Sequence, residues 1–263
     1  MRNLLIIFVL FYTLVSAQSN EIIRDDWNKY FNEFGFDGSF VLYDLNNDTF
    51  YRYNKEVCSQ QFIPASTFKI PNTLIGLETG VITGKDFELK WDGVKREIET
   101  HNQDQNLETA FKYSAVWYYQ EVARRIGEER MKKFVDSINY GNKNIGGGID
   151  RFWLDGEIRI SADEQIEFLK KIYHKELPFS ERTFNILKEI MVYDKNDNYT
   201  IRAKTGWAVR SSNQTGWFVG YVERNENVYF FAVNIHSAKN QKDFGKARIE
   251  ITKNILKEMK ITE

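Results

Sequence analysis

The stretch Pro64-Ala65-Ser66-Thr67-Phe68-Lys69-Ile70 decides how the rest of this chain is interpreted. Ser66 and Lys69 are three residues apart, so they share one face of an α-helix or eclipse each other in a 3₁₀ turn. Either geometry brings the lysine amine beside the serine hydroxyl. A serine becomes a nucleophile when a neighbouring base takes its proton, and a lysine can be that base when desolvation keeps its amine neutral. Alone, such a pair is more often a polar helix start with a snorkelling lysine, so the rest of the chain has to support the catalytic interpretation.

Two further motifs lie where a serine–lysine site needs them. Lys204-Thr205-Gly206 ends an expected strand, where the lysine supplies positive charge and the glycine allows close approach by a substrate. Ser114-Ala115-Val116 lies at a helix junction and offers a second hydroxyl for proton relay. This order of three motifs is the signature of the penicillin-recognising serine acyltransferases, and it is far more specific than any single member.

The apolar periodicity places strands at both ends of the chain and helices in the middle. The pattern predicts strands over 38–44, 49–53, 199–205, 217–222 and 228–235. It predicts helices over 25–36, 66–78, 107–113, 116–126, 129–138, 161–174, 181–191 and 244–260. The fold class expected from this order is α+β: one antiparallel sheet flanked by N- and C-terminal helices, with a mainly helical insertion.

The first 17 residues have the pattern of a signal peptide. A short basic start precedes a mostly apolar run that is too short to span a bilayer comfortably, and Val15-Ser16-Ala17 fits a cleavage site. We therefore expect residues 18–263 to form a single exported domain, periplasmic in a bacterium, with no stable membrane insertion. The net charge of −1 and the lack of polybasic runs argue against a nucleic-acid partner.

Cysteine and histidine give little sign of further chemistry. Cys58 is the only cysteine and is expected to be a small core residue. The three histidines, His101, His174 and His236, show no metal-ligand spacing, so we expect no metal and no separate cofactor.

The finer pattern resembles one branch of these acyltransferases, the class D (oxacillinase-type) serine β-lactamases. The resemblance covers essentially the whole mature chain. It is carried by Ser66-Thr67-Phe68-Lys69, Ser114-Ala115-Val116, Tyr140-Gly141-Asn142, Phe152-Trp153-Leu154-Asp155-Gly156 and Lys204-Thr205-Gly206. Penicillin-binding proteins and class A enzymes usually have Asn at the third position of the second motif, where this chain has Val116. The class A loop glutamate has no clear counterpart, and Asp150, Asp155 and Glu157 are interpreted as polar loop residues.

The resemblance implies a role for each matching residue. Ser66 would open the β-lactam ring as nucleophile, and Lys69 would carry carbon dioxide as a carbamate (N6-carboxylysine) that acts as general base. Trp153 would hydrogen-bond the carbamate, and Val116 and Leu154 would keep it dry. Ser114 would transfer a proton to the leaving nitrogen, and Lys204 would attract the substrate electrostatically. The backbone N–H groups of Ser66 and Trp207, beside Gly206, would form the oxyanion hole. Thr205 and Arg248 would bind the substrate carboxylate.

Two other functions remain open at this level. A penicillin-binding D,D-peptidase would acylate but hydrolyse penicillin slowly, and Val116 argues against it. A β-lactam sensor domain would stay acylated, but such receptors carry a membrane-embedded segment and this chain shows only a leader. The sequence does not decide which β-lactams are hydrolysed, nor whether the protein is a monomer or a homodimer.

Overall fold

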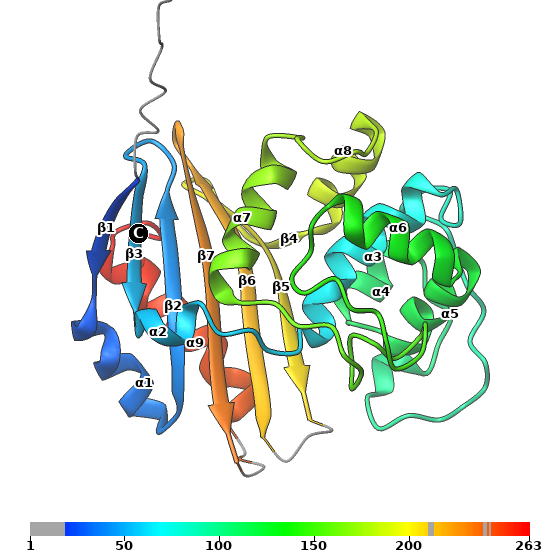
Figure 1. Cartoon of the computed structure of the whole chain (residues 1–263), viewed down its shortest axis with the longest axis horizontal. Coiled ribbons are helices and arrows are strands. Elements are labelled where there is room, and N and C mark those ends of the chain that lie inside the picture. Colours follow the sequence, from blue (N-terminus) through cyan, green and yellow to red (C-terminus); the bar gives the residue numbers. More distant parts are fainter. Residues whose placement is uncertain (1–18, 210–212, 239–240, 242) are drawn as a thin grey trace, which may run out of the picture.

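A seven-stranded sheet runs through the molecule, in the order β1-β3-β2-β7-β6-β5-β4 (Figure 1). The computed structural model describes residues 19–209, 213–238, 241 and 243–263, so the expected signal peptide lies outside the described residues. The strands are β1 (Asn20–Ile23), β2 (Asp37–Asp44), β3 (Thr49–Tyr53), β4 (Val192–Lys195), β5 (Thr200–Ala208), β6 (Gln214–Arg224) and β7 (Asn227–Ser237).

Helices cover both faces of this sheet. The described helices are η1 (Asp25–Trp27), α1 (Asn28–Phe34), α2 (Lys55–Cys58), η2 (Ala65–Phe68), α3 (Lys69–Glu78), η3 (Glu99–His101), α4 (Leu107–Lys112), α5 (Val116–Ile126), α6 (Glu128–Ser137), α7 (Ala162–Tyr173), α8 (Glu181–Ile190) and α9 (Phe244–Glu258). In Figure 1, α7 lies across the sheet on the near face, α9 lies behind it, and α3 to α6 form a helical lobe beside β5. The α+β class is confirmed.

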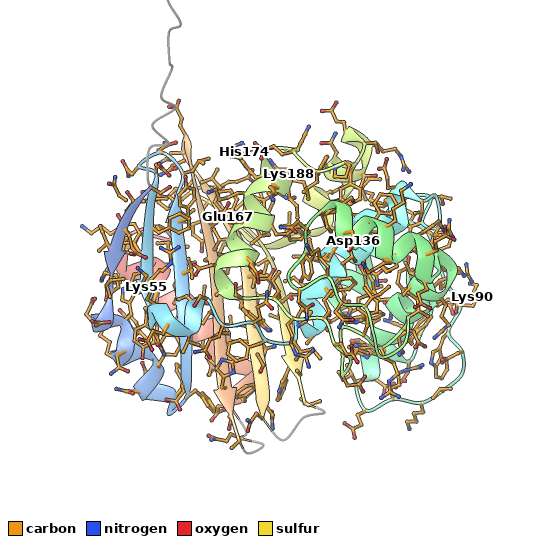
Figure 2. The ribbon with its side chains drawn as sticks, in the orientation of Figure 1. Lys55, Lys90, Asp136, Glu167, His174 and Lys188 are labelled. Atoms are coloured by element: carbon orange, nitrogen blue, oxygen red, sulfur yellow. The ribbon has the colours of Figure 1, made fainter. Side chains whose placement is uncertain are left out.

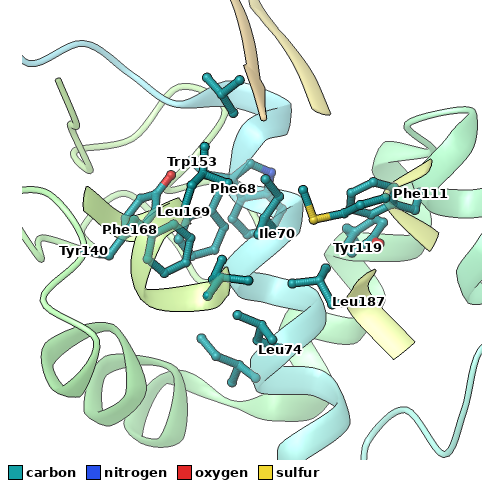
Figure 3. Close-up of a cluster of buried hydrophobic side chains, with 14 of the residues drawn as sticks. Phe68, Ile70, Leu74, Phe111, Tyr119, Tyr140, Trp153, Phe168, Leu169 and Leu187 are labelled. Atoms are coloured by element: carbon teal, nitrogen blue, oxygen red, sulfur yellow. The ribbon is translucent and has the colours of Figure 1, made fainter. Parts of the chain in front are cut away.

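Two hydrophobic cores explain this layering. Because side chains alternate along a strand, the sheet supplies apolar residues to both faces. On one face, Phe40, Phe218 and Phe231 pack with Phe244 and Ile251 of α9. On the other, the core runs from the sheet into the helical lobe, and Figure 3 shows part of it on both sides of α3. Every residue of α3 from Lys69 to Leu77 is buried, so this helix is the centre of the lobe.

The sheet differs from the expected one at its edges. Five of the six neighbouring pairs are antiparallel, but β1 pairs with β3 in parallel. The sequence analysis missed β1 and β4, because each has four mostly exposed residues without an apolar alternation. The predicted helix over 25–36 begins as a 3₁₀ turn and ends at Phe34, where Gly35 takes a left-handed conformation (φ +70°).

Sequence signals near the starts of α3 and α7 agree with the structure. Pro71 is the third residue of α3, where the missing N–H costs no intrahelical bond. The capping box before α7 is confirmed: Ser161 Oγ accepts from the Glu164 N–H at 3.1 Å, and the Ser161 N–H donates to the Glu164 carboxylate at 2.7 Å. Cys58 is fully buried, as expected, and burial raises the pKa of its thiol to about 12.

Charged side chains of both signs cover the outside of the molecule, as Lys55, Lys90, Asp136 and Glu167 illustrate (Figure 2). Many form exposed ion pairs, for example Lys132 with Asp136 at 2.6 Å. No helix among the described residues is long and apolar enough to cross a membrane.

Candidate active site

The turn η2 and the start of α3 place Ser66 and Lys69 together. Lys69 Nζ lies 2.9 Å from Ser66 Oγ, within hydrogen-bond distance. Ser66 is half-buried, whereas Lys69 has no exposed surface. Ala65, directly before Ser66, has a positive φ of +48°, which is strained for a residue with a Cβ. The predicted serine–lysine pair is therefore formed, and a strained backbone precedes it.

Burial favours the neutral form of the Lys69 amine. Desolvation lowers the pKa of Lys69 well below its usual value, and the charge of nearby Lys204 lowers it further. The surroundings are aromatic: the Tyr119 ring centroid lies 5.2 Å from Nζ, and Figure 3 shows α3 between Tyr119 and Phe111 on one side and Trp153 on the other. A neutral amine beside a serine hydroxyl can accept its proton.

Trp153 is fully buried and its ring is packed by neighbouring aromatic side chains. The indole stacks on Phe68, the residue before Lys69, at 5.6 Å and 17°, and meets Phe152 edge-on at 4.9 Å. Its Nε1–H has no hydrogen-bond partner among the described residues. Because an unpaired buried donor costs free energy, this orphan N–H marks a place for an acceptor.

The second motif lies at the junction of α4 and α5. Ser114 has a positive φ of +59° and its side chain lines the same pocket as Ser66. Val116 is the first residue of α5, and it lines this pocket together with the nearly buried Leu154. These two side chains give the pocket that contains Ser66 an apolar part.

The third motif lies at the edge of β5 that faces the helical lobe. Lys204 is 4% exposed, and burial followed by the charge of Arg248 lowers its pKa to about 7. A Cβ at Gly206 would lie 2.8 Å from the Pro64 carbonyl oxygen, so the close approach there is made by the η2 segment of the chain itself, not only by a substrate. The ring of Trp207 is partly exposed and its Nε1 donates to Gln214 Oε1 at 2.8 Å.

Arg248 reaches the same place from α9. It is 8% exposed, and its Nε and Nη1 are buried without a partner among the described residues. Its guanidinium lies 5.6 Å from the Trp207 ring centroid, and burial lowers its pKa to about 10. No described carboxylate pairs with Lys69, Lys204 or Arg248. Lys204 and Arg248, two neighbouring basic side chains without a paired carboxylate, form a site for an anionic ligand.

One pocket of about 600 Å³ joins most of the predicted residues. Lys69 and Trp153 are buried beside it, and Lys204 lines an adjoining pocket of about 470 Å³ that shares Thr205 with it. The predicted residues that line the main pocket are Ser66, Ser114, Val116, Leu154, Thr205, Gly206, Trp207 and Arg248.

The sequence analysis missed one wall of this pocket. Glu97, Ile98, His101 and Tyr113 line it, and all but Tyr113 belong to the long connection between α3 and α4. That connection has no apolar periodicity and no catalytic motif, so it offered no signal. Val209, which follows β5, also lines the pocket, and residues 210–212 after it lie outside the described part.

The acidic residues of the 150s loop have structural partners, as expected. Asp150 pairs with Arg124 at 2.6 Å, Asp155 with Arg151 at 2.5 Å, and Glu157 accepts from Asn144 at 2.8 Å. Tyr140-Gly141-Asn142 joins this loop, because the Asn142 N–H donates to the Arg159 carbonyl at 2.9 Å. The described residues contain no group of three side chains that could hold a metal ion.

Comparisons with known proteins agree with this geometry. The family described as penicillin binding protein transpeptidase domain matches residues 13–257. The chain is 48% identical to the β-lactamase OXA-48 of Klebsiella pneumoniae, covering 89% of this chain and 88% of that protein. A class D β-lactamase structure, YbXI from Nostoc, is 49% identical with a TM-score of 0.87, covering 89% and 98%. The C-terminal domain of the Bacillus licheniformis BlaR penicillin-receptor is 34% identical with a TM-score of 0.88, covering 93% and 98%.

Proposed function

Because the chain belongs to the class D β-lactamases, within the penicillin-binding transpeptidase domain family, we propose that it hydrolyses the β-lactam amide through an acyl-enzyme on Ser66, with N-carboxylated Lys69 as general base. The observation that carries this proposal is the fully buried Lys69 amine 2.9 Å from Ser66 Oγ, in a site that also holds the unpaired Trp153 Nε1–H.

The residues around Lys69 suit a carbamate. Carbon dioxide reacts only with a neutral amine, and desolvation favours that form of Lys69 by lowering its pKa. A C–N bond forms between Nζ and the carbon of carbon dioxide, and one amine proton leaves for solvent. Trp153 Nε1–H would hold the resulting anion, and Val116 and Leu154 would exclude water from it. Bound there, the carbamate supplies a general base for both acylation and deacylation.

The protein's own groups would carry the remaining steps. Ser66 Oγ loses its proton as it attacks the lactam carbonyl, and the backbone N–H groups of Ser66 and Trp207 would stabilise the oxyanion. Ser114, on the opposite wall of the pocket, would deliver a proton to the lactam nitrogen as the C–N bond breaks. Water then attacks the ester carbonyl and regenerates the Ser66 hydroxyl.

The substrate carboxylate would bind between β5 and α9. Thr205 and Arg248 both line the pocket, and the two unpaired nitrogens of Arg248 can donate to a carboxylate. Lys204 would add charge beneath them, because Arg248 and Lys204 are close enough to lower the pKa of the lysine. A β-lactam carboxylate thereby supplies the anion that the protein alone lacks.

The same fold also occurs in a receptor, the BlaR penicillin-receptor domain, so penicillin sensing is the alternative to hydrolysis. Sensors and hydrolases differ in whether the acyl-enzyme is released, so turnover separates them. Purified residues 18–263 should hydrolyse nitrocefin over many cycles. One stoichiometric burst without further turnover would instead assign the chain to the sensors or the D,D-peptidases.

Export and resistance follow from the same proposal. Cleavage after Ala17 would release residues 18–263 as a single periplasmic domain, where β-lactams meet the cell wall. Expression of the full chain in a bacterium should raise the β-lactam concentration needed to stop growth. The same chain without residues 1–17 is the control and should protect less.

A further inference from the structure

The lining of the catalytic pocket carries charges of both signs. One wall, formed by β5 and α9, presents Thr205 and the buried guanidinium of Arg248. Another wall comes from the 97–101 segment and the end of α4, and its only charged lining residue among those described is Glu97. A pocket of about 600 Å³ therefore has a carboxylate, an arginine and Ser66 in one lining.

Glu97 is available to a ligand. Within the described parts of the chain, its carboxylate has no ion pair and no hydrogen bond, and the side chain is exposed. Its basic neighbour Arg96 is occupied elsewhere, because it donates two hydrogen bonds to Asp92, at 2.8 and 2.6 Å. By contrast, the nearby Glu99 accepts from Asn102 at 3.5 Å and does not line the pocket.

The rest of this wall offers no competing cation. His101 Nε2 lies 2.8 Å from the Tyr113 carbonyl oxygen, and because a carbonyl only accepts, this nitrogen carries the proton. The other ring nitrogen of His101 is then an acceptor, and Ile98 beside it is apolar. The wall thus holds a negative charge, a hydrogen-bond acceptor and apolar surface.

We propose that Glu97 selects β-lactams that carry a positively charged substituent in addition to their carboxylate. The carboxylate would bind at Arg248 and Thr205, and the cationic group, an ammonium or a pyridinium, would lie against Glu97. This inference rests on the proposed function and adds a specificity residue to it. Because Glu97 is exposed, the preference should be modest, about two- to fivefold in kcat/KM.

Two pairs of substrates isolate the charge. Ampicillin differs from benzylpenicillin by an ammonium on the acyl side chain, and cephaloridine differs from cephalothin by a pyridinium in place of an acetoxy group on the ring side. For each pair, the ratio of kcat/KM for the member with the cationic substituent to the member without it is measured in wild-type protein, in Glu97→Gln and in the control Glu99→Gln. We expect Glu97→Gln to lower at least one ratio by about two- to fivefold, while Glu99→Gln leaves both unchanged.

Salt gives a second readout of the same contact. Raising the ionic strength from about 0.01 to about 1 M shortens the screening length from about 30 to about 3 Å, so it should reduce the wild-type ratio towards that of Glu97→Gln. The pair that responds identifies the side of the substrate that faces Glu97. Equal ratios in wild type and Glu97→Gln for both pairs, with turnover intact, would overturn the inference alone. Absence of turnover of all four compounds by wild-type protein would overturn the proposed function and the inference with it.

Discussion

Two regions of this molecule differ in how their charged side chains are paired. Where the N-terminal helix meets α9, one carboxylate, Glu258, accepts from four donors: Arg24 at 2.5 Å, Lys29 at 2.5 Å, Tyr30 at 2.7 Å and Trp27 at 3.0 Å. In the catalytic cleft, Lys69, Lys204 and Arg248 lie close together, and no described carboxylate pairs with any of them.

The difference separates structural from functional polar groups. A fully satisfied network stabilises the fold, because each buried group has the partner that desolvation requires. An unsatisfied cluster costs free energy in the free protein, and a ligand that supplies the missing partners recovers it. Positive φ does not follow this division: Ala65 and Ser114 have it in the catalytic motifs, but Lys143, Lys175 and Lys260 have it elsewhere.

The strongest test of this division removes the nucleophile. Ser66→Ala should lower turnover by roughly 10⁴-fold or more, because no other described group can form the acyl-enzyme. Mass spectrometry after mixing with a slowly hydrolysed β-lactam should show one adduct on the wild-type peptide that contains Ser66, and none in the variant. An adduct that persists in Ser66→Ala would place the nucleophile elsewhere.

The next test removes the unpaired donor, Trp153 Nε1–H. Trp153→Phe keeps most of the ring but removes Nε1–H, so the carbamate on Lys69 should become less stable. We expect deacylation to slow by roughly 10²- to 10³-fold, and acylation by less. Bicarbonate should restore part of the activity, and ¹³C NMR with labelled bicarbonate should show a weaker carbamate signal than in wild type.

Wild-type protein provides the control for that test. Its turnover should fall in carbon-dioxide-depleted buffer and in acid, where the carbamate is lost, and should return with bicarbonate. Full turnover in degassed buffer, without a carbamate signal, would instead make plain neutral Lys69 the base.

A third test removes a cation from the cleft. Lys204→Ala should lower kcat/KM for carboxylate-bearing substrates by about 10²-fold. The pKa of Lys204 is about 7, so its charge is present below that pH and is lost as the pH rises. Since kcat/KM reports the free enzyme, the defect of the variant should be largest below about pH 7 and should shrink above it. A defect that is independent of pH would move the anion site to Arg248 alone.

A fourth test measures the stability of a variant that lacks an unpaired charge in the cleft. Arg248→Leu removes a guanidinium with two unpaired nitrogens, so the midpoint of thermal unfolding should stay equal or rise while activity falls. A lower midpoint would mean that Arg248 stabilises the fold through its stacking on Trp207.

Sequence patterns predicted the site more fully than its surroundings. The spacing of Ser66 and Lys69 predicted their contact, because a 3₁₀ turn brings residues three apart together. The order of the motifs predicted that Ser114 belongs to the same site, and it lines the same pocket as Ser66. The Glu97 wall could not be predicted, because its position depends on how a long connection folds over α5. The edge strands β1 and β4 escaped detection since their pairing is set by neighbouring strands and not by their own composition.

We expect the smallest effect on activity from a change at Glu258, whose carboxylate accepts from four donors. Glu258→Gln keeps the size of the side chain but removes the charge that four donors share. Burial raises the pKa of Glu258, but hydrogen bonds from Lys29, Tyr30, Trp27 and Arg24 outweigh this and bring the pKa to about 2. We expect the variant to lose about 1–2 kcal/mol of unfolding free energy at pH 7, after allowance for solvent screening of a partly exposed site.

The pH dependence of that loss gives the sign of the effect. Because the folded pKa is depressed below the usual 4.5, the stabilisation is complete above about pH 4.5 and disappears as the pH falls towards 2. Urea unfolding of wild type and Glu258→Gln should therefore diverge at pH 7 and converge in acid, while nitrocefin turnover at pH 7 stays the same. A loss of turnover with unchanged stability would mean that the two regions are coupled through α9, which carries both Glu258 and Arg248.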